Sequence, residues 1–403
     1  MIKKIKTDQL RMGMYIQDFN CGWMKHPFFN KTAKITSQKM LEKVVNAGIL
    51  ELFIDTDKGV DLLDEKAEKE QKMKVQNKLN EIAEMKLEEV ASVPLEKEIE
   101  KAKEIKDEAK NTVQNIMEEI RFGKPIKTEQ AENVVDKMVD SIFRNQDALI
   151  SLGRIKKTDE YTYLHSMSVC VLMISFGKHL GFDTRQLREI GIGAMLHDVG
   201  KMMVPPEVLN KPDPLNGEEY KLMKEHVVHS RLLLQKTKGI SDISILLASQ
   251  HHERMDGNGY PDGLKGDEIS LYGQSAAIAD VYDAMTSQRC YQKKFEPTEV
   301  LRKLFEWGKL YNQELVQKFI KCIGIYPVGS LVRLDSGLLG IILNHGEKSL
   351  LHPSVRIIFD TNKDQFLSPY DIDLSIQSGK DFQDKVKCWE SGEQWNIQIE
   401  KYM

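Results

Sequence analysis

The stretch "HHERMDGNGYP", residues 251–261, places two histidines and a glutamate directly before a glycine-rich turn that ends in tyrosine and proline. Histidine is the commonest metal ligand in proteins, and glycine permits the positive φ angles of sharp turns. We expect Gly257 and Gly259 to use this freedom, so that the chain turns beside a ligand pair and holds Tyr260 near its mouth. A plain turn with Tyr260 packed on the fold is the alternative that the stretch alone leaves open.

The chain around this stretch repeats apolar side chains at helical spacing from residue 125 to about 325. Glycines and prolines separate the successive segments, and Asp183 stands three residues before Gln186, which is the spacing of a helix-capping box. Strand patterns do not alternate with these segments, so a parallel sheet is not expected. Residues 125–325 therefore predict an all-α bundle.

The zones at the two ends differ from the bundle. Residues 1–60 hold a helix-like segment followed by the short strand pattern "ELFIDT", which favours a small α+β N-terminal module. Residues 326–403 switch to a period of two and predict a β-rich C-terminal extension, with strands in "GSLVRLDSGLLGIILNHG", "SVRIIFDT" and "WNIQIEKY". The fold class is thus mainly α, with two smaller additions.

Residues 61–124 form a predicted helical linker. A start rich in Lys, Glu and Gln is followed by apolar residues three and four positions apart from Leu95 to Ile120, which indicates an amphipathic helix of about 25 residues. We expect this helix to pack on the bundle of its own chain. A coiled coil that joins two copies is the alternative.

Composition limits the class of protein. The 403 residues are 41% hydrophobic with a net charge of −4, which allows a real core but gives no general attraction to nucleic acid or anionic membranes. The five cysteines form no CxxC pair, as is typical of free thiols in a reducing compartment. The apolar runs fall far short of the roughly 20 residues of a membrane helix. We expect a cytoplasmic protein that inserts into no membrane and binds no nucleic-acid polymer.

Histidines and carboxylates occur on several helices of the bundle. One histidine on an apolar helix is usually a hydrogen-bonded core residue, but burying many imidazoles and carboxylates together is costly without a cation. Facing helices can hold a two-metal site, and nitrogen and oxygen donors without clustered thiolates disfavour structural zinc and permit iron or manganese. The residues concerned are His165, His197, Asp198, His226, His229, His251, His252 and Asp280.

Asp198 directly follows His197, and a carboxylate can bridge two cations with its two oxygens. Two metals about 3.5–4 Å apart can hold a hydroxide and clamp a phosphate oxygen. Lys201 lies three residues after Asp198 on the same helix face, where its charge can hold a phosphate. A solvated lysine at a helix end is the alternative for Lys201.

Five motifs match one known family in type, spacing and order. They are "YLHS", "LHDVGK", "MKEH", "HHERMDGNGYP" and "ADVYDAMTSQRCY", between about Asp159 and Gln292. This region resembles the HD-GYP subgroup of the HD-domain phosphohydrolases. The resemblance implies that a metal-activated hydroxide hydrolyses cyclic di-GMP to linear pGpG, which lowers the level of this second messenger in bacterial signalling. A second cut to GMP stays open.

The resemblance also implies the roles of individual residues. Asp198 and Lys201 would be catalytic, and Asp198 would bridge two divalent transition metals, iron or manganese. Substrate would be bound by Lys201, Tyr260, Asp283 and Arg289. His229 and His179 match no family ligand and are interpreted as structural. The implied metal ligands are His165, His197, Asp198, His226, His251, His252 and Asp280.

Two positions depart from the family. Members with a third metal carry a glutamate where this chain has Tyr161, which favours two metals. A basic residue often follows the arginine by three positions, and this chain has Gln292 there, so one phosphate contact is missing. The N-terminal module and the β-rich extension resemble parts found in the same subgroup, and neither offers a catalytic constellation.

Other functions stay open beside hydrolysis of cyclic di-GMP. One is a catalytically weak sensor of cyclic dinucleotides, or a docking module; the filled ligand positions argue against it. Another is a phosphodiesterase of a mixed cyclic GMP–AMP dinucleotide. The expected partners are cyclic di-GMP, a diguanylate cyclase (GGDEF) protein that docks on the GYP turn, and a second copy of the chain that pairs through the linker helix.

Overall fold

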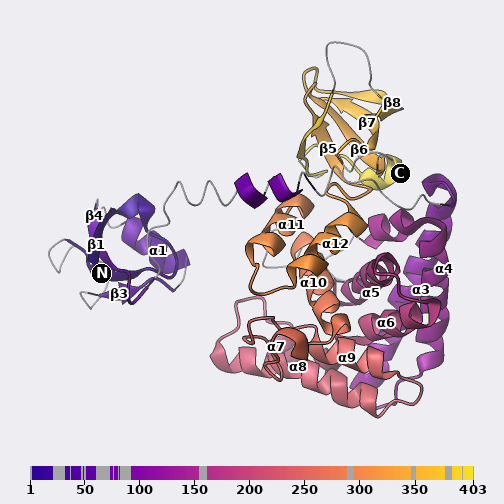
Figure 1. Ribbon diagram of the computed structural model, residues 1–403, viewed down its shortest axis with the longest axis horizontal. Coiled ribbons are helices and arrows are strands. Elements are labelled where there is room, and N and C mark those ends of the chain that lie inside the picture. The colour runs from indigo at the N-terminus through magenta and orange to yellow at the C-terminus, as the bar shows by residue number, and fades with distance from the viewer. Residues whose placement is uncertain are drawn as a thin grey trace. The chain divides into compact units, whose positions relative to one another are not determined.

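The chain divides into two compact units, Met1–Lys74 and Val75–Met403, which are described separately (Figure 1). The division falls inside the predicted linker. The computed structural model describes residues 2–20, 32–36, 38–46, 49, 51–59, 73–75, 77–79, 81, 92–153, 161–287, 295–345, 351–376, 384–392 and 394–402.

In the described residues, the smaller unit is an antiparallel sheet accompanied by the helix α1, as the α+β pattern predicts. Its strands are β1 (Ile2–Lys6), β2 (Tyr15–Asp18), β3 (Ala33–Lys34) and β4 (Glu51–Asp55), in the order β1-β4-β2-β3, with α1 at Gln38–Asn46 and a 3-10 turn, η1, at Thr7–Gln9. Strand β4 is the predicted "ELFIDT" strand. Ile16, Val44, Leu52 and Ile54 are fully buried and form its core.

The larger unit begins with a bundle of helices, in agreement with the predicted all-α zone. Helix α5 is apolar over most of its surface and contacts α3, α4, α6, α10 and α12, so it lies inside the bundle. The helices of this unit are α3 (Leu95–Arg121), α4 (Thr128–Gly153), α5 (Tyr161–His179), α6 (Thr184–Leu196), η3 (Val199–Met203), α7 (Pro206–Leu209), α8 (Gly217–Gln235), α9 (Asp242–Gln250), η4 (Gly266–Glu268), α10 (Leu271–Thr286), α11 (Pro297–Glu306) and α12 (Gln313–Ile323).

The predicted capping box fixes the start of α6. The Oδ1 atom of Asp183 accepts a hydrogen bond from the Gln186 backbone at 2.8 Å, and Oε1 of Gln186 accepts one from the Asp183 backbone at 3.1 Å. These two bonds satisfy N–H groups that have no partner within the helix. The start of α6 sets the register that brings its last residues to the centre of the bundle.

The amphipathic helix of the linker is α3, and it packs within the larger unit. Its apolar stripe, from Leu95 to Ile120, is buried mainly against α4. Glu98 is also buried there and accepts hydrogen bonds from Arg144 at 2.7 and 2.8 Å and from Ser141 at 2.8 Å. The stripe that a coiled coil would need is therefore covered by the same chain.

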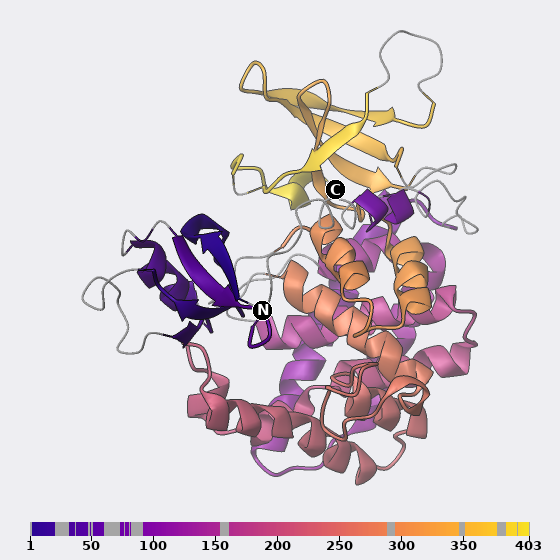
Figure 2. The same cartoon turned by 60° about the vertical axis from the view of Figure 1, so that its left-hand side comes forward.

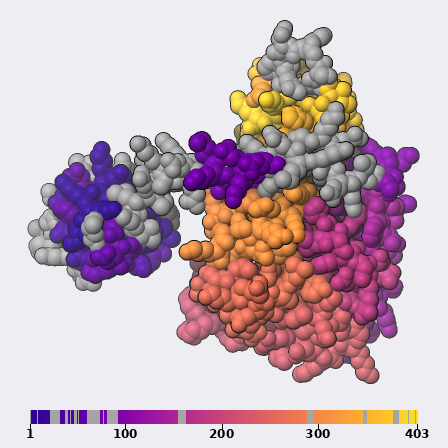
Figure 3. Space-filling view, viewed as in Figure 1, coloured from indigo at the N-terminus to yellow at the C-terminus, as the bar shows by residue number. Residues whose placement is uncertain are grey.

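The β-rich extension follows α12 as one antiparallel sheet, which Figure 2 shows in yellow and light orange beyond the helices. Figure 3 shows its surface directly above that of the last helices, and side chains such as Val332 and Ile357 continue the helical core into the sheet. Its strand order is β8-β7-β6-β5-β9. The strands are β5 (Leu331–Leu334), β6 (Leu338–Asn344), β7 (Ser354–Asp360), β8 (Gln365–Asp373) and β9 (Val386–Trp389).

One predicted strand of this extension is wrong. "WNIQIEKY" forms a turn and the 3-10 helix η5 (Ile399–Tyr402) instead. Ile397 is buried in a cluster with Leu331 and Leu339 of the sheet, so the alternation reflects side chains that pack on the sheet rather than backbone pairing. None of the helices in the described ranges is long and apolar enough to cross a membrane.

Candidate metal centre

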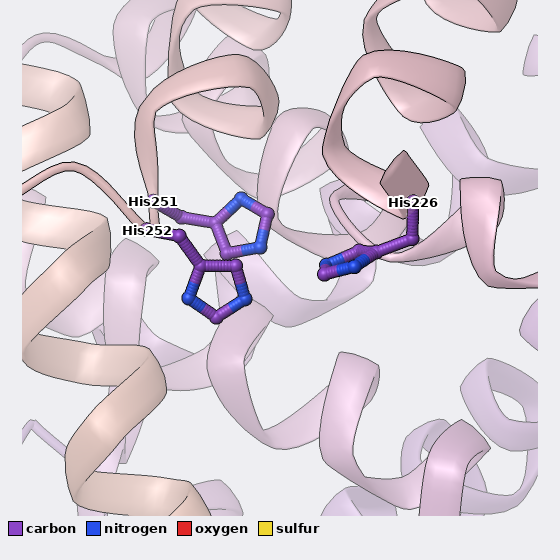
Figure 4. A group of neighbouring side chains, drawn as sticks. All are labelled: His226, His251 and His252. Carbon is purple, nitrogen blue, oxygen red and sulfur yellow. The ribbon is translucent and has the colours of Figure 1, made fainter. Parts of the chain in front are cut away.

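The implied ligands come from five parts of the bundle and meet at its centre. His165 lies on α5, His197 and Asp198 lie between α6 and η3, His226 lies on α8, the pair His251 and His252 follows α9, and Asp280 lies on α10. Figure 4 shows the ring of His226 directed across the centre toward the rings of His251 and His252. All are buried except His252, whose side chain is 20% exposed. The cluster therefore has one partly open side.

Their donor atoms form three overlapping groups, each with atoms within 4.8 Å of one another. One end of the cluster holds His226, His251 and His252, and the other holds His165, His197 and Asp280. The third group, His197, Asp198 and His251, shares one member with each end. The cluster is thus long enough to have two ends, joined through Asp198.

The two oxygens of Asp198 face different ends. Oδ2 lies 3.2 Å from Nε2 of His197 and 3.7 Å from Nε2 of His165, whereas Oδ1 lies 3.3 Å from Nε2 of His226 and 4.0 Å from Nε2 of His251. A carboxylate in this position can offer one oxygen to each of two cations. Its geometry matches the bridging role that the sequence implied.

Hydrogen bonds to the far ring nitrogens orient the histidines. Nδ1 of His197 donates to the carbonyl of Ala194 at 2.7 Å, and Nδ1 of His251 donates to that of Ala248 at 2.8 Å. His226 does the same to a carbonyl one turn back, at 2.6 Å. Because a carbonyl can only accept, each neutral ring must carry its proton on Nδ1 and turn the lone pair of Nε2 into the cluster.

Several of these inward atoms lack the partner that burial requires. In the described part of the chain, no hydrogen bond reaches Nε2 of His197, His226 or His251, or Oδ1 of Asp198, although all are buried. Such atoms normally carry a desolvation cost of about 1–3 kcal/mol each. Divalent cations would satisfy them, and the imidazole and carboxylate donors suit a transition metal. The residues present therefore fit a metal centre.

The electrostatics of the cluster favour the ligand forms of two of these residues. Burial, together with the charge of neighbouring His197, lowers the pKa of His251 to about 3. Burial alone would raise the pKa of Asp198, but the charges of His197 and Lys201 outweigh it and hold that pKa well below its ordinary value. At neutral pH a neutral imidazole and an ionised carboxylate result, which are the protonation states that bind metal.

Lys201 and Asp283 differ in how they face the cluster. Nζ of Lys201 lies 2.5 Å from Oδ2 of Asp198, and the Lys201 side chain is 21% exposed. The charge of Lys201 therefore stands beside the carboxylate that is proposed to bridge. Asp283 is buried, and its Oδ2 accepts a hydrogen bond of 2.6 Å from Nδ1 of His165. It stands behind this ligand, where it can orient the ring and strengthen the donor. The substrate contact implied for Asp283 stays a prediction beside this one.

The glycine-rich turn closes beside the cluster, but its two glycines act differently. Gly257 has a φ of +81°, as expected. The positive φ expected for Gly259 is wrong. A Cβ atom at this position would clash with the backbone nitrogen of Arg254, so this glycine permits a close approach of two backbone segments.

Glu253 holds the turn from inside, although the sequence did not single it out. Its buried carboxylate accepts hydrogen bonds from three backbone N–H groups of the turn, those of Asp262, Gly263 and Leu264, at 2.8–3.2 Å.

Tyr260 packs against the open side of the cluster. Its ring stacks on His252, with centroids 4.6 Å apart, and Nζ of Lys224 lies over it at 5.1 Å from the centroid. The ring is therefore held by the fold at the edge of the cluster. This arrangement combines the two alternatives that the turn left open, because the ring is packed and still stands at the mouth.

Comparisons with known proteins place this arrangement in a family. A family model described as "HD domain" matches residues 140–315, and one described as a domain of unknown function (DUF3391) matches residues 2–131. A Pseudomonas aeruginosa protein named cyclic di-GMP phosphodiesterase is 36% identical over 98% of this chain and 94% of its own length. The chain belongs to the HD-GYP group of HD-domain phosphohydrolases.

Other relatives match a shorter part of the chain. A cyclic di-GMP phosphodiesterase of Thermotoga maritima is 35% identical over 47% of this chain and 52% of its own length. A 3′3′-cGAMP-specific phosphodiesterase of Vibrio cholerae is 36% identical over 38% of this chain and 36% of its own length. Relatives named for either substrate are therefore similar to part of this chain. HD-domain phosphohydrolases are metal-dependent, and this chain contains an HD domain.

Some residues of the implied HD-GYP site lie outside the described residues. Arg289 and Gln292 both fall in the undescribed range 288–294, so the second implied phosphate contact stays a prediction. Tyr161 begins α5, but its side chain is also outside the description. His229 lies on α8, 3.9 Å from Glu225, and takes no place in the cluster groups.

Proposed function

We propose that this HD-GYP protein hydrolyses cyclic di-GMP to linear pGpG and so lowers a bacterial second messenger. The observation that carries the proposal is the convergence of seven histidine and aspartate residues. Four of them, His197, Asp198, His226 and His251, each direct inward a buried atom that no hydrogen bond reaches in the described part of the chain. The name of the relative that aligns over nearly the full chain supports the substrate. A further cut of pGpG to GMP would use the same centre.

Two transition metals, iron or manganese, would occupy the centre. Asp198 would bridge them, with His165, His197 and Asp280 at one end and His226, His251 and His252 at the other. The nitrogen and oxygen donors favour these metals over structural zinc. When bound, such metals supply Lewis-acid stabilisation of the charge that develops on a phosphate oxygen.

The chain's own residues would bind and orient the substrate. Lys201, beside Asp198, would hold the oxygens of the reacting phosphate as a point charge. Arg289 would contact a phosphate as well, and Tyr260 would border the bound nucleotide. Water then adds to phosphorus and the ribose 3′ oxygen leaves, which opens the ring. The buried walls of the cluster limit competing water and strengthen each charge interaction.

A metal-analysed preparation tests the proposal directly. Purified protein loaded with iron or manganese is given cyclic di-GMP, 3′3′-cGAMP and cyclic di-AMP, and products are separated by chromatography. We expect pGpG from cyclic di-GMP and none from the Asp198→Ala variant. Binding of cyclic di-GMP without turnover by fully metal-loaded protein would instead support the sensor hypothesis and overturn the enzymatic one.

A mixed cyclic GMP–AMP dinucleotide is the second candidate substrate. The specific observation in its favour is the Vibrio cholerae relative, which is named for that substrate and is 36% identical over 154 residues. Values of kcat/KM for the two substrates, measured on one preparation, separate the candidates. A higher kcat/KM for 3′3′-cGAMP would reassign the substrate and leave the metal centre unchanged.

The partners beyond substrate are also proposals. A GGDEF cyclase would dock on the turn at residues 256–262, and the enzyme would act in the cytoplasm. Co-purification of a GGDEF protein with wild-type protein, lost when Asn258 at the exposed tip is changed to Arg, tests the docking. A dimer through α3 is less supported, because the apolar stripe of α3 is buried on its own chain; light scattering would report it.

A further inference from the structure

Lys224 stands at the edge of the metal centre and is used by none of the roles assigned above. It lies on α8, two residues before His226, and is partly exposed. Its Nζ lies over two aromatic rings, 4.7 Å from the centroid of Tyr220 and 5.1 Å from that of Tyr260. Tyr220 is one helical turn earlier on the same face, so the two rings hold the ammonium group from different elements.

Three other described cations near the turn already have partners. Lys201 pairs with Asp198 at 2.5 Å, and Arg231 pairs with Asp262 at 2.6 Å. Arg254 donates to the carbonyl of Glu253 at 2.9 Å and lies over an aromatic ring. In contrast, no carboxylate of the described chain lies within ion-pair distance of Lys224. Its charge remains available to an anion that approaches the open side of the cluster.

The position of this charge relative to the ligands follows from Tyr260. The ring of Tyr260 stacks on the ring of His252, the most exposed of the proposed ligands, with centroids 4.6 Å apart. The Nζ atom of Lys224 lies over this same Tyr260 ring. A cyclic dinucleotide carries two phosphodiester groups. When one is at the metal centre, the other needs a cation at some distance from it, and the Nζ of Lys224 lies at such a place, over the ring of Tyr260.

We propose that Lys224 binds the phosphate of the cyclic dinucleotide that is not being cleaved, and that Tyr220 and Tyr260 hold its ammonium group in place. The inference rests on the proposed function, since it concerns how the same site holds its substrate. It assigns to this lysine a role in substrate recognition and none in metal binding.

The test compares a two-phosphate and a one-phosphate substrate. Lys224→Met keeps an apolar stem on the Tyr260 ring but removes the charge. With cyclic di-GMP we expect kcat/KM to fall about tenfold or more, mainly through a higher KM, because a hydrogen bond to a charged group is lost. With bis(p-nitrophenyl) phosphate, which has a single phosphodiester, we expect no change. Metal content should stay at the wild-type value, and Lys224→Arg should retain most activity.

Lys221→Met is the matched control, because Lys221 is one turn away on α8 but pairs with Glu218 at 2.8 Å on the exposed face. If Lys224→Met behaves like Lys221→Met with cyclic di-GMP, the inference is wrong. Equal losses on both substrates, or loss of metal, would show that Lys224 only supports the fold around Tyr260. If wild-type protein cleaves bis(p-nitrophenyl) phosphate but no cyclic dinucleotide, the proposed substrate fails; calorimetric titration of cyclic di-GMP into the Lys224 variants then still decides the contact.

Discussion

The ring of Tyr260 stacks on the ring of His252, with centroids 4.6 Å apart and an angle of 27° between the planes. His252 is the most exposed of the proposed ligands, with a side chain that is 20% exposed. The stack therefore restrains the ligand that has most freedom to rotate. Through it, we expect the glycine-rich turn to act on the proposed metal centre as well as on substrate.

A pair of changes at Tyr260 separates these two actions. Tyr260→Phe keeps the stack, and we expect unchanged metal binding. Tyr260→Ala removes it, and we expect metal affinity to fall about tenfold, at the lower end of the range for groups that orient a ligand. Competition with a chromophoric chelator measures the affinity. If Tyr260→Ala keeps its affinity and only KM for cyclic di-GMP rises, the ring acts on substrate alone.

Asp198 provides the sharpest test of the two-ended cluster. Its two oxygens face different ends, so Asp198→Ala removes a donor from both. We expect elemental analysis to show loss of most of the bound metal, and activity to disappear with it. Lys201→Met is the control, since it removes the charge beside Asp198 but no donor; it should keep its metal and lose turnover. Full metal occupancy in Asp198→Ala would contradict the bridging arrangement.

Asp283 should act on metal through His165. Its carboxylate accepts the Nδ1 proton of that ligand at 2.6 Å and is itself buried. Asp283→Ala frees the ring to rotate and removes the charge behind it, so we expect metal affinity to fall about 10–100-fold. The control is Thr286→Ala on the same helix, where only hydrogen bonds to the backbone carbonyls of Tyr282 and Asp283 are lost. An unchanged affinity with a higher KM would restore the substrate role that the sequence implied.

The ligand cluster could be predicted from sequence because each ligand is tied to a short motif on a helix. The helical period fixes which side chains face inward, and "HDVGK" or "HHE" names the donors within it. The same argument explains why α3 and the capping box at Asp183 were found. Local spacing was enough in each of these cases.

Contacts between distant segments could not be predicted in this way. Glu253 accepts hydrogen bonds from backbone N–H groups nine to eleven residues later in the chain. The Nζ atom of Lys224, on α8, lies over the ring of Tyr260 in the glycine-rich turn. Neither contact follows a regular spacing of residues that the sequence could show. The β-rich extension was predicted correctly, but one of its strands was misplaced for a related reason. Strand β8 is an edge strand with mostly exposed residues and so lacks apolar alternation, whereas Ile397 and Ile399 alternate because they pack on the sheet.

Glu253 should hold the turn that carries Tyr260. Glu253→Gln keeps the size of the side chain but turns an amide N–H₂ toward backbone N–H groups, which leaves at least one buried donor without an acceptor. We expect the free energy of unfolding to fall by about 1–3 kcal/mol. Trypsin should also cut faster at Arg254 or Lys265, which flank the turn.

Glu268→Gln is the matched control, because the exposed Glu268 caps only the end of the same turn through the Lys265 N–H at 2.8 Å. We expect its effect to stay within about 0.5 kcal/mol. Both variants are measured with metal bound, so that the neighbouring His252 does not add its own effect. Equal stability and equal cleavage rates in the two variants would show that the turn is held by its other contacts, such as the ion pair of Arg231 with Asp262.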